Sequence, residues 1–504
     1  MLCSPDQWIK RIPRVAWIGI YLLLVTGGLS ILFFGWAYDD PFITYRYAKN
    51  LSSGLGFVYN PGELLLSTTT PLFTILLATL HPLYADLPKL AVVIGAFSMA
   101  LGGLCLWDLL ERPGLKFSRW AGLLFYPIFP LVIITLGSET PLYLALCLGA
   151  FASYRRQRFL LAALSASLAA LTRPDGVLVA GILGLHYLWS NPPKHHQWRH
   201  WFASLPWQSM LIYLSVGLSW LIYAWITFGS PIPLTLFAKQ QQAMVPGSQA
   251  FLPGLMTILS WYSSWLYRLQ AFLVLPGLVY GLLHSNTMRW LAAWVALYFG
   301  AYSLLGVTRY FWYYAPLVPL FVISFGMGLD GLSALAHRLL QNDQIKVAEK
   351  VARTTASIIP GLLLIFLLLV QAGKLWNQHL KPDVRYPIYR AVGEWLSENT
   401  PADASVGTLE VGIIGYYSQR PMVDFSGLIQ PDVADIIGQT GSYPTAAYWA
   451  VTQYNPKYLV LQQGLFIEIE TAILPDCQLE VTFPGAAYDY AYDIGIYTCP
   501  SVAG

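Results

Sequence analysis

Two adjacent acids, Asp39 and Asp40, are the residues of this 504-residue sequence with the clearest capacity for chemistry. Neighbouring carboxylates repel each other, which raises the pKa of one of them, and a carboxylate that titrates near neutrality is an efficient general base. Pro41 suits the first turn of a helix, so Asp40 has an equally good interpretation as a helix N-cap. A cap needs only one carboxylate, which leaves Asp39 as a candidate base.

A further carboxylate, Glu139, stands in the motif Gly137-Ser-Glu-Thr-Pro141. Its alternative role is structural, because the helix dipole favours an acid in the first turn. Taken together with the acidic pair, however, Glu139 is predicted to be a second active-site carboxylate. Asp175 follows Arg173 in a Pro- and Gly-containing turn, where the two residues have an alternative role as a local clamp.

Four basic residues form a set that suits the phosphate of an anionic lipid headgroup. They are Arg46, Arg173, Lys239 and Arg309. Arg309 opens an aromatic run that includes Tyr313 and Tyr314, which is also typical of an ordinary interfacial aromatic belt.

No nucleotide-binding or metal-binding motif occurs in the chain. It has no Walker A sequence, no GxGxxG fingerprint before a helix and no Cys/His metal spacing. A nucleotide donor is therefore not indicated, and an activated substrate should reach the site from the membrane. No cofactor is predicted, while the need for a divalent metal is left open.

The composition shows what must hold these residues in place. The chain is 56% hydrophobic and only 11% charged, whereas soluble globular domains have about 25% charged residues. A soluble enzyme, a nucleic-acid binder and a disordered scaffold are therefore excluded. Residues 1–373 contain 23 basic and 12 acidic side chains, and residues 374–504 contain 6 and 14. This division predicts a transmembrane catalytic domain, 1–373, and a polar extracytoplasmic domain, 374–504.

The apolar segment from Val15 to Trp36 is long enough to span a bilayer and lacks a cleavage site, so we expect it to be the first of about 11 spans. Pro71–Tyr84 is shorter, because about 14 helical residues reach only ~21 Å. It is predicted to be a juxtamembrane or re-entrant helix. The other spans are expected near 89–110, 119–136, 140–154, 159–172, 175–190, 208–228, 264–284, 289–306, 311–330 and 355–373.

The distribution of basic residues predicts the orientation of these spans. If Pro71–Tyr84 stays outside, 16 of the 23 basic residues of the membrane domain fall in cytoplasmic loops, as the positive-inside rule requires. The N-terminus is then inside, and the C-terminal domain is outside. Nearly all the candidate site residues map to the outer face, where ionisable groups at a membrane boundary indicate function.

Two predictions concern the outer elements. Ile43, Tyr47 and Leu51 recur at helical spacing, which predicts an amphipathic helix lying at the outer interface. The C-terminal domain is predicted to be a small α/β unit with a helix near Ile388–Ser397 and strands near Ala404–Leu409, Tyr458–Leu461 and Ile494–Tyr497. Cys477 and Cys499 are the only cysteines there, and whether they form a disulfide is left open.

These motifs resemble those of the GT-C superfamily, the multi-spanning glycosyltransferases that use polyprenyl-phosphate sugars. The resemblance is closest to the bacterial branch that contains the mycobacterial arabinofuranosyltransferases. Its motifs run in order over most of the chain: Asp39–Ala48, Gly54–Glu63, Gly137–Thr140, Leu171–Gly176, Pro231–Thr235 with Lys239, Trp312–Pro316, Glu410–Asp424 and Gly427-Leu428.

The resemblance implies an inverting sugar transfer at the outer face of the bacterial inner membrane. Asp39 or Asp40 would deprotonate the acceptor hydroxyl, and Glu139 would orient acceptor or donor. The four basic residues would bind and neutralise the leaving phosphate. The implied partners are a polyprenyl-phosphate sugar and a glycan, lipid or protein acceptor. The residues expected to contact substrate are Asp175, Tyr313, Tyr314 and Glu410.

Two alternatives to a glycosyltransferase are a transporter or flippase of lipid-linked saccharides and an oligosaccharide ligase or polymerase. A transporter should carry polar groups at the membrane midplane and often has internal repeats. This chain instead concentrates its ionisable groups at one membrane face and has no evident repeat. The transferase hypothesis is therefore favoured.

Overall fold

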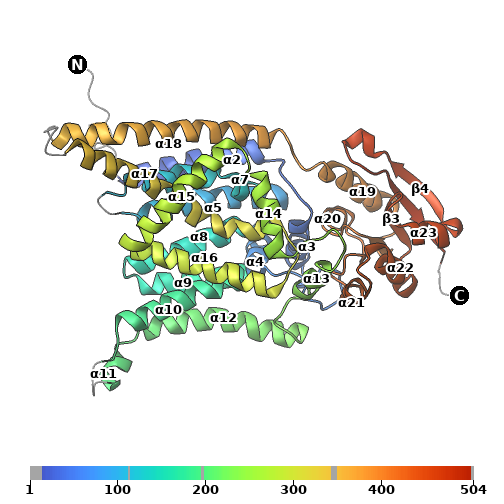
Figure 1. Ribbon diagram of the computed structural model, residues 1–504. Coiled ribbons are helices and arrows are strands. Elements are labelled where there is room, and N and C mark those ends of the chain that lie inside the picture. Colours follow the sequence, from blue (N-terminus) through green and yellow to red (C-terminus); the bar gives the residue numbers. More distant parts are fainter. Residues whose placement is uncertain (1–13, 112–113, 194–197, 342–348, 501–504) are drawn as a thin grey trace.

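The computed structural model describes residues 14–111, 114–193, 198–341 and 349–500. Long helices run side by side in one body, and a smaller unit with a β-sheet lies at one end of it (Figure 1). Five of the 16 basic residues assigned above to cytoplasmic loops lie outside the described residues: Lys10, Arg11, Arg112, Lys194 and Lys346.

Six helical segments of the described chain are long and apolar enough to cross a membrane. They are α2 (Arg14–Phe33), α5 (Leu87–Leu109), α12 (Trp207–Phe228), α15 (Trp265–His284), η4 with α17 (Phe311–Leu317 and Val318–Leu340) and α18 (Glu349–His379). The other main helices of the body are α8 (Thr140–Arg155), α9 (Phe159–Thr172), α10 (Val177–Ser190), α11 (Trp198–Ala203), α13 (Leu234–Gln242), α14 (Phe251–Trp261) and α16 (Asn286–Leu305).

The predicted count of 11 spans is only partly matched by this set. Helices α8, α9 and α10 have 14 to 16 residues, so they reach only about 21–24 Å at 1.5 Å per residue. The polytopic helical architecture is thus confirmed, while the full count of 11 stays a prediction.

The predicted span at 119–136 is not one continuous helix. It consists of α6 (Lys116–Trp120), the π-helix η1 (Ala121–Phe125), the 3-10 turn η2 (Tyr126–Ile128) and the short α7 (Pro130–Ile133). Pro127 and Pro130 cause the breaks, because proline has no N–H to donate and clashes with the preceding turn. The two prolines were the only sequence signal of this interruption, because the composition of the segment is apolar throughout.

Helix α3 (Asp40–Ser52) differs most from its prediction. Nine of its 13 residues are buried, so it is not an amphipathic helix lying on the outer interface. The reason is that it is enclosed from two sides, by α4 (Pro71–Leu80) and by α20 (Ile413–Ser418) of the C-terminal unit. Phe42 and Leu77 share one hydrophobic core with Ile388 and Ile413. The C-terminal unit therefore packs directly on α3.

The C-terminal unit contains a mixed sheet in the order β2-β1-β3-β5-β4. Strands β1 (Val406–Thr408), β2 (Met422–Asp424) and β3 (Tyr458–Gln462) are parallel, and β4 (Gln478–Phe483) and β5 (Ile494–Thr498) are antiparallel to their neighbours. Its helices are α19 (Arg385–Asn399), α20, α21 (Pro431–Thr440), α22 (Tyr443–Tyr454) and α23 (Ile467–Ala472).

The three predicted strands and the predicted helix of this unit all form, whereas β2 and β4 were not predicted. Cys477 and Cys499 are joined by a disulfide, which settles the pairing that the sequence leaves open. Helix α18 continues past residue 373 to His379, so the division of the chain at 373/374 stays a prediction.

Candidate active site

A cavity of about 430 Å³ opens in the helical body beside α3, and six of the predicted site residues line it. We call it the body cavity. The six are Asp40, Glu139, Arg173, Asp175, Lys239 and Tyr313. They come from five separate segments of the chain. The fold therefore brings together side chains that the sequence analysis grouped only by their chemistry. The rest of the wall is formed by hydroxyl-bearing and apolar residues that include Thr68, Thr70, Pro231, Ile232 and Leu178.

Lys239 is the cation nearest to the acidic pair. Its Nζ lies 3.4 Å from Oδ1 of Asp40 and 5.0 to 5.7 Å from the ring centroids of Tyr310, Trp312 and Tyr313. Only 7% of Lys239 is exposed. Burial opposes its charge, but Asp40 and Tyr313 outweigh that cost, so the pKa of Lys239 is raised and the amine stays protonated.

Arg173 joins two carboxylates in the same cavity. Its guanidinium lies 3.2 Å from Oδ1 of Asp175 and 3.6 Å from Oε1 of Glu139, and it donates a hydrogen bond of 2.8 Å to the hydroxyl of Tyr302. The local clamp considered for Arg173 and Asp175 therefore exists, and it extends to Glu139. Burial raises the pKa of Glu139, and the charge of Arg173 acts against that shift.

A tight turn between α9 and α10 sets the position of Arg173. Gly176 lies so close to α9 that a Cβ atom there would stand 2.4 Å from the carbonyl carbon of Ala169. A glycine is therefore required, and the sequence Arg-Pro-Asp-Gly is explained by packing as well as by charge.

A second cavity, of about 380 Å³, lies between the helical body and the C-terminal unit. We call it the interdomain cavity. The body contributes Arg309 and Tyr310, and the C-terminal unit contributes Arg385, Glu410 and Tyr443. Asp40 and Trp312 line both cavities. Asp40 thus stands where the two cavities adjoin, with a third of its side chain exposed.

Asp39 has a different environment from its neighbour. Its two carboxylate oxygens accept hydrogen bonds from the backbone N–H groups of Gly412, at 3.0 Å, and Ile413, at 2.7 Å. A Cβ on Gly412 would lie 2.1 Å from the carbonyl oxygen of Asp39, so only glycine permits this approach. Asp39 therefore fixes the C-terminal unit to the body.

The buried Asp39 and the partly buried Glu410 are interacting acids at this junction. Burial raises the pKa of Asp39, and the charge of Glu410 raises it further. Burial likewise raises the pKa of Glu410, while Arg385 acts against the shift. At least one proton is therefore held more tightly in the folded chain than in an unfolded one.

This pair predicts a dependence of stability on pH. A carboxyl whose pKa is raised on folding stabilises the fold fully below its ordinary pKa, here 3.8 for Asp39, and that stability is lost as the pH rises through the raised value. We expect the thermal melting temperature of the purified chain to fall as the pH rises from about 4 toward 9. Asp39→Asn should flatten this profile, and an unchanged profile in that variant would argue against the pair.

The fold of the whole chain is similar to solved structures of membrane glycosyltransferases. ArnT from Cupriavidus metallidurans, bound to undecaprenyl phosphate, covers 98% of this chain and 100% of its own length at 12% identity and a TM-score of 0.59. In the apo state ArnT covers 97% and 99%, with a TM-score of 0.61. The Archaeoglobus fulgidus oligosaccharyltransferase, tethered with an acceptor peptide, covers 92% of this chain and 70% of its own at 14% identity and a TM-score of 0.59.

The chain has the GT-C fold.

The sequence comparisons match a smaller part of the chain than the structural comparisons do. Residues 377–497 match a family described only as a domain of unknown function, DUF8728. Comparison with curated protein sequences found no match. The membership in the arabinofuranosyltransferase-like branch stays a prediction within the GT-C fold.

Besides Asp39, four predicted residues do not line the body cavity of this GT-C fold. Arg309 and Glu410 line the interdomain cavity, where Arg309 donates a hydrogen bond to the side chain of Gln249. Arg46 is buried and donates to the backbone oxygens of Tyr59, Gly415 and Arg420, so we do not include it among the phosphate ligands. The hydroxyl of the buried Tyr314 donates to the backbone oxygen of Phe251, which supports a packing role.

Sequence reasoning missed several residues of the two cavities. Tyr302, Thr68 and Thr70 line the body cavity, and Arg385 and Tyr443 line the interdomain cavity. Thr68 and Thr70 were visible as part of a threonine run, but Arg385 had no signal beyond its place in an acidic region. Among the described residues, no group of three His, Cys, Asp or Glu side chains is suited to a metal ion, and the need for a metal stays an open question.

Proposed function

We propose that this chain is an inverting glycosyltransferase, which moves a sugar from a polyprenyl-phosphate donor to a glycan, lipid or protein acceptor at the outer face of the bacterial inner membrane. The observation that carries the proposal is the position of Asp40. It lines both cavities and lies 3.4 Å from Lys239. A general base between a donor site and an acceptor site is what a direct displacement requires.

We assign the donor to the body cavity. Lys239 and Arg173 are its two cations, and a phosphate oxygen is a good partner for both an ammonium and a guanidinium group. ArnT from Cupriavidus metallidurans was solved with undecaprenyl phosphate bound, which supports a lipid phosphate in a chain with the same fold. The aromatic rings around Lys239 limit the access of water to the phosphate.

The contact between Asp40 and Lys239 suggests how charge is balanced during the reaction. Before transfer, Lys239 pairs with the Asp40 carboxylate. When Asp40 takes the proton of the acceptor hydroxyl it becomes neutral, while the acceptor oxygen bonds to the anomeric carbon and the phosphate leaves with both electrons of the broken C–O bond. Lys239 is then available to the leaving phosphate. The amine therefore stabilises negative charge where it develops.

We assign the acceptor to the interdomain cavity. Its aromatic lining residues, which include Trp261, Tyr310, Trp312 and Tyr443, offer faces on which sugar rings can stack. Glu410 and Arg385 supply polar partners from the C-terminal unit. An acceptor in this cavity would reach Asp40 from the side opposite to the donor, which fits an inverting displacement at a single carbon.

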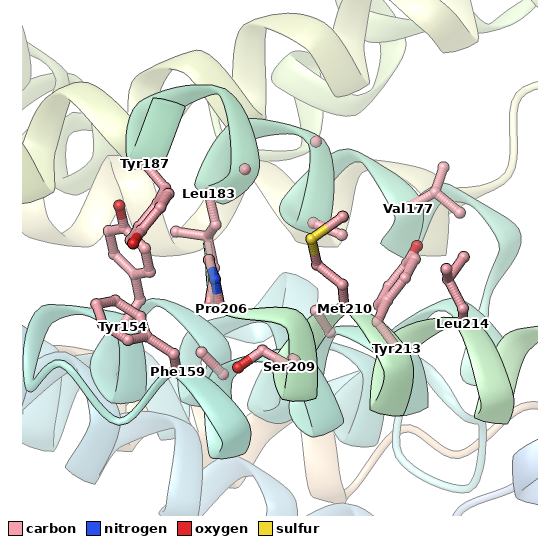
Figure 2. Close-up of a pocket in the computed structure, with 16 residues that line it drawn as sticks. Tyr154, Phe159, Val177, Leu183, Tyr187, Pro206, Ser209, Met210, Tyr213 and Leu214 are labelled. Carbon is pink, nitrogen blue, oxygen red and sulfur yellow. The ribbon is translucent and has the colours of Figure 1, made fainter. Parts of the chain in front are cut away.

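We assign the isoprenoid tail of the donor to an apolar groove that shares the lining residue Val177 with the body cavity (Figure 2). It has a volume of about 480 Å³, and Val177 lines both the groove and the body cavity. Small residues of α9, such as Ala162 and Ala166, lie along it, and α10 and α12 form its sides. Figure 2 shows Val177 at one end of the groove and Tyr154 at the other.

A larger side chain in the groove tests the assignment of the isoprenoid tail to it. Gly181 lines the groove, and a Cβ on it would meet no atom within 4 Å, so Gly181→Leu should place its side chain in the groove without strain. We expect the KM for a long-chain polyprenyl-phosphate sugar to rise about tenfold and the KM for a short-chain analogue to stay unchanged. Gly217→Leu on α12 is the matched control, because Gly217 has the same open surroundings but does not line the groove. Equal kinetics for the two variants would remove the groove from the donor site.

The proposed activity is tested with purified protein in detergent and a panel of polyprenyl-phosphate sugars. A transferase releases free polyprenyl phosphate and forms a new glycoside whose anomeric configuration is opposite to that of the donor. A flippase reconstituted in vesicles would move the lipid without releasing phosphate. If no donor releases polyprenyl phosphate in the presence of membrane-derived acceptors, the proposal is contradicted.

A further inference from the structure

A groove at the other end of the helical body has no part in the proposed reaction. It has a volume of about 1090 Å³ and is lined by α2, the end of α5, α6 and η1. Helix α2 ends at Phe33, shortly before Asp39. Trp17, which lines the groove, lies near the other end of α2, about 24 Å from Phe33 at 1.5 Å per residue. We call it the far-end groove, because it lies at the end of α2 that is remote from the candidate active site.

The far-end groove combines an apolar wall with a charged rim. Ile20, Leu24, Leu123 and Leu124 line the wall. Tyr21 closes one side, where its hydroxyl donates to the backbone oxygen of Leu123 at 2.7 Å. The groove therefore has the two-part chemistry of a lipid, with a long apolar trough that leads away from charged groups.

The rim carries an excess of guanidinium groups. Arg119, Arg156 and Arg158 line it with Asp108 and Glu111, three cations against two carboxylates. Arg156 engages both acids, through a 2.7 Å hydrogen bond to Asp108 and a 3.6 Å ion pair with Glu111. Within the described residues, the exposed side chain of Arg158 has no ion-pair partner. The three arginines exceed the two acids by one charge, so the lining of the groove has a net positive charge.

Aromatic residues mark this rim as a membrane boundary. The rings of Trp107 and Trp120 meet edge to face at 4.9 Å, and the guanidinium of Arg119 lies 4.0 Å from the centre of the Trp107 ring. Tryptophan is enriched at the level of lipid headgroups. A rigid, stacked arginine at that level is well placed to bind a phosphodiester.

We propose that the far-end groove is a binding site for one anionic phospholipid, whose acyl chains lie in the trough between α2 and η1 and whose phosphate pairs with Arg158 and Arg119. The charge of the rim selects an anionic headgroup over a zwitterionic one. The π-helix η1 keeps the wall of the trough open, because it interrupts the regular helix at Leu123 and Leu124. This site is independent of the proposed sugar transfer.

The test is lipid binding by the purified full-length chain, measured by native mass spectrometry and by the shift in thermal melting temperature. The probes are phosphatidylglycerol, phosphatidylcholine with the same acyl chains, and glycerol 3-phosphate. We expect one retained phosphatidylglycerol per chain, bound at least about fivefold more tightly than phosphatidylcholine, and no effect of glycerol 3-phosphate. Arg158→Gln should weaken phosphatidylglycerol binding about fivefold, and its combination with Arg119→Gln should abolish the preference.

The matched control is Arg353→Gln, which removes an exposed arginine that pairs with Glu349 on α18 and does not line the groove. It should leave the binding of phosphatidylglycerol unchanged. The lipid-free melting temperature of each variant checks that the fold is intact. Equal retention of the two lipids, equal affinity in Arg158→Gln and Arg353→Gln, or a stabilising effect of glycerol 3-phosphate without acyl chains would each overturn the proposal.

Discussion

Asp40→Asn is expected to reduce the rate of sugar transfer about a thousandfold, within the 10²- to 10⁴-fold range of a positioned general base. An asparagine fills the same space but cannot accept a proton from the acceptor hydroxyl. The loss should appear in kcat, while the KM for the donor changes little, because Lys239 and Arg173 remain in the body cavity. Single-turnover release of polyprenyl phosphate is the measurement.

Asp39→Asn is the matched control for this experiment. The two residues are neighbours, yet Asp39 is only 8% exposed and both of its oxygens accept from backbone amides. We expect this variant to lower the melting temperature and to retain much more activity than Asp40→Asn. If Asp39→Asn abolished transfer in folded protein while Asp40→Asn remained active, the assignment of the base would be reversed.

Lys239→Gln is expected to lower kcat about 10²- to 10³-fold, the usual effect of removing one group that stabilises charge in a transition state. The glutamine keeps a hydrogen-bond donor but brings no charge to the leaving phosphate. The melting temperature should change little, because Asp40 is partly exposed and can be solvated when its partner is lost. Lys239→Arg should restore part of the rate, since the charge returns in a larger group.

The control for Lys239 is Lys89→Gln. Lys89 also forms an ion pair with an acid, Asp86 at 2.7 Å, but its side chain is 41% exposed and lines neither cavity. Its removal should leave turnover unchanged, since exposed ion pairs contribute little. A loss of activity in both variants would show that net charge, and not the position of Lys239, is what matters.

The candidate site could be predicted in part because membrane depth makes charge costly. Glu139, Arg173, Asp175 and Lys239 are far apart in the sequence, and each has an ordinary structural explanation when taken alone. Their scarcity in an apolar chain marked them as a set. The body cavity contains all four. The α/β character of the C-terminal unit was also predictable, because its strands alternate with turns that contain Gly, Pro and Asn.

The different roles of Asp39 and Asp40 could not be predicted from the sequence. Their separation depends on Gly412 and Ile413, which are more than 370 residues away and donate to Asp39 alone. The structural role of Arg46 could not be predicted from the sequence either. Arg46 is a buried cation whose shortest hydrogen bonds go to backbone oxygens. A sequence motif does not distinguish such a structural arginine from a phosphate ligand.

The burial of α3 was missed for a related reason. Its spacing of Ile43, Tyr47 and Leu51 predicts one apolar face, but the other side of the helix meets α20 of the C-terminal unit. The spacing of apolar residues shows which face of a helix is apolar, but it does not show which distant segment packs against the other face. The interdomain cavity depends on the same contact, so the acceptor side was less predictable than the donor side.

The most direct test of the proposed mechanism is a structure of the full chain with a polyprenyl phosphate bound. We expect the phosphate to lie in the body cavity, within ion-pair distance of Lys239 Nζ and beside Arg173, with the isoprenoid tail in the groove that begins at Val177. A phosphate bound at Arg309 in the interdomain cavity, with the body cavity empty, would contradict the assignment of donor and acceptor and the role of Asp40 between them.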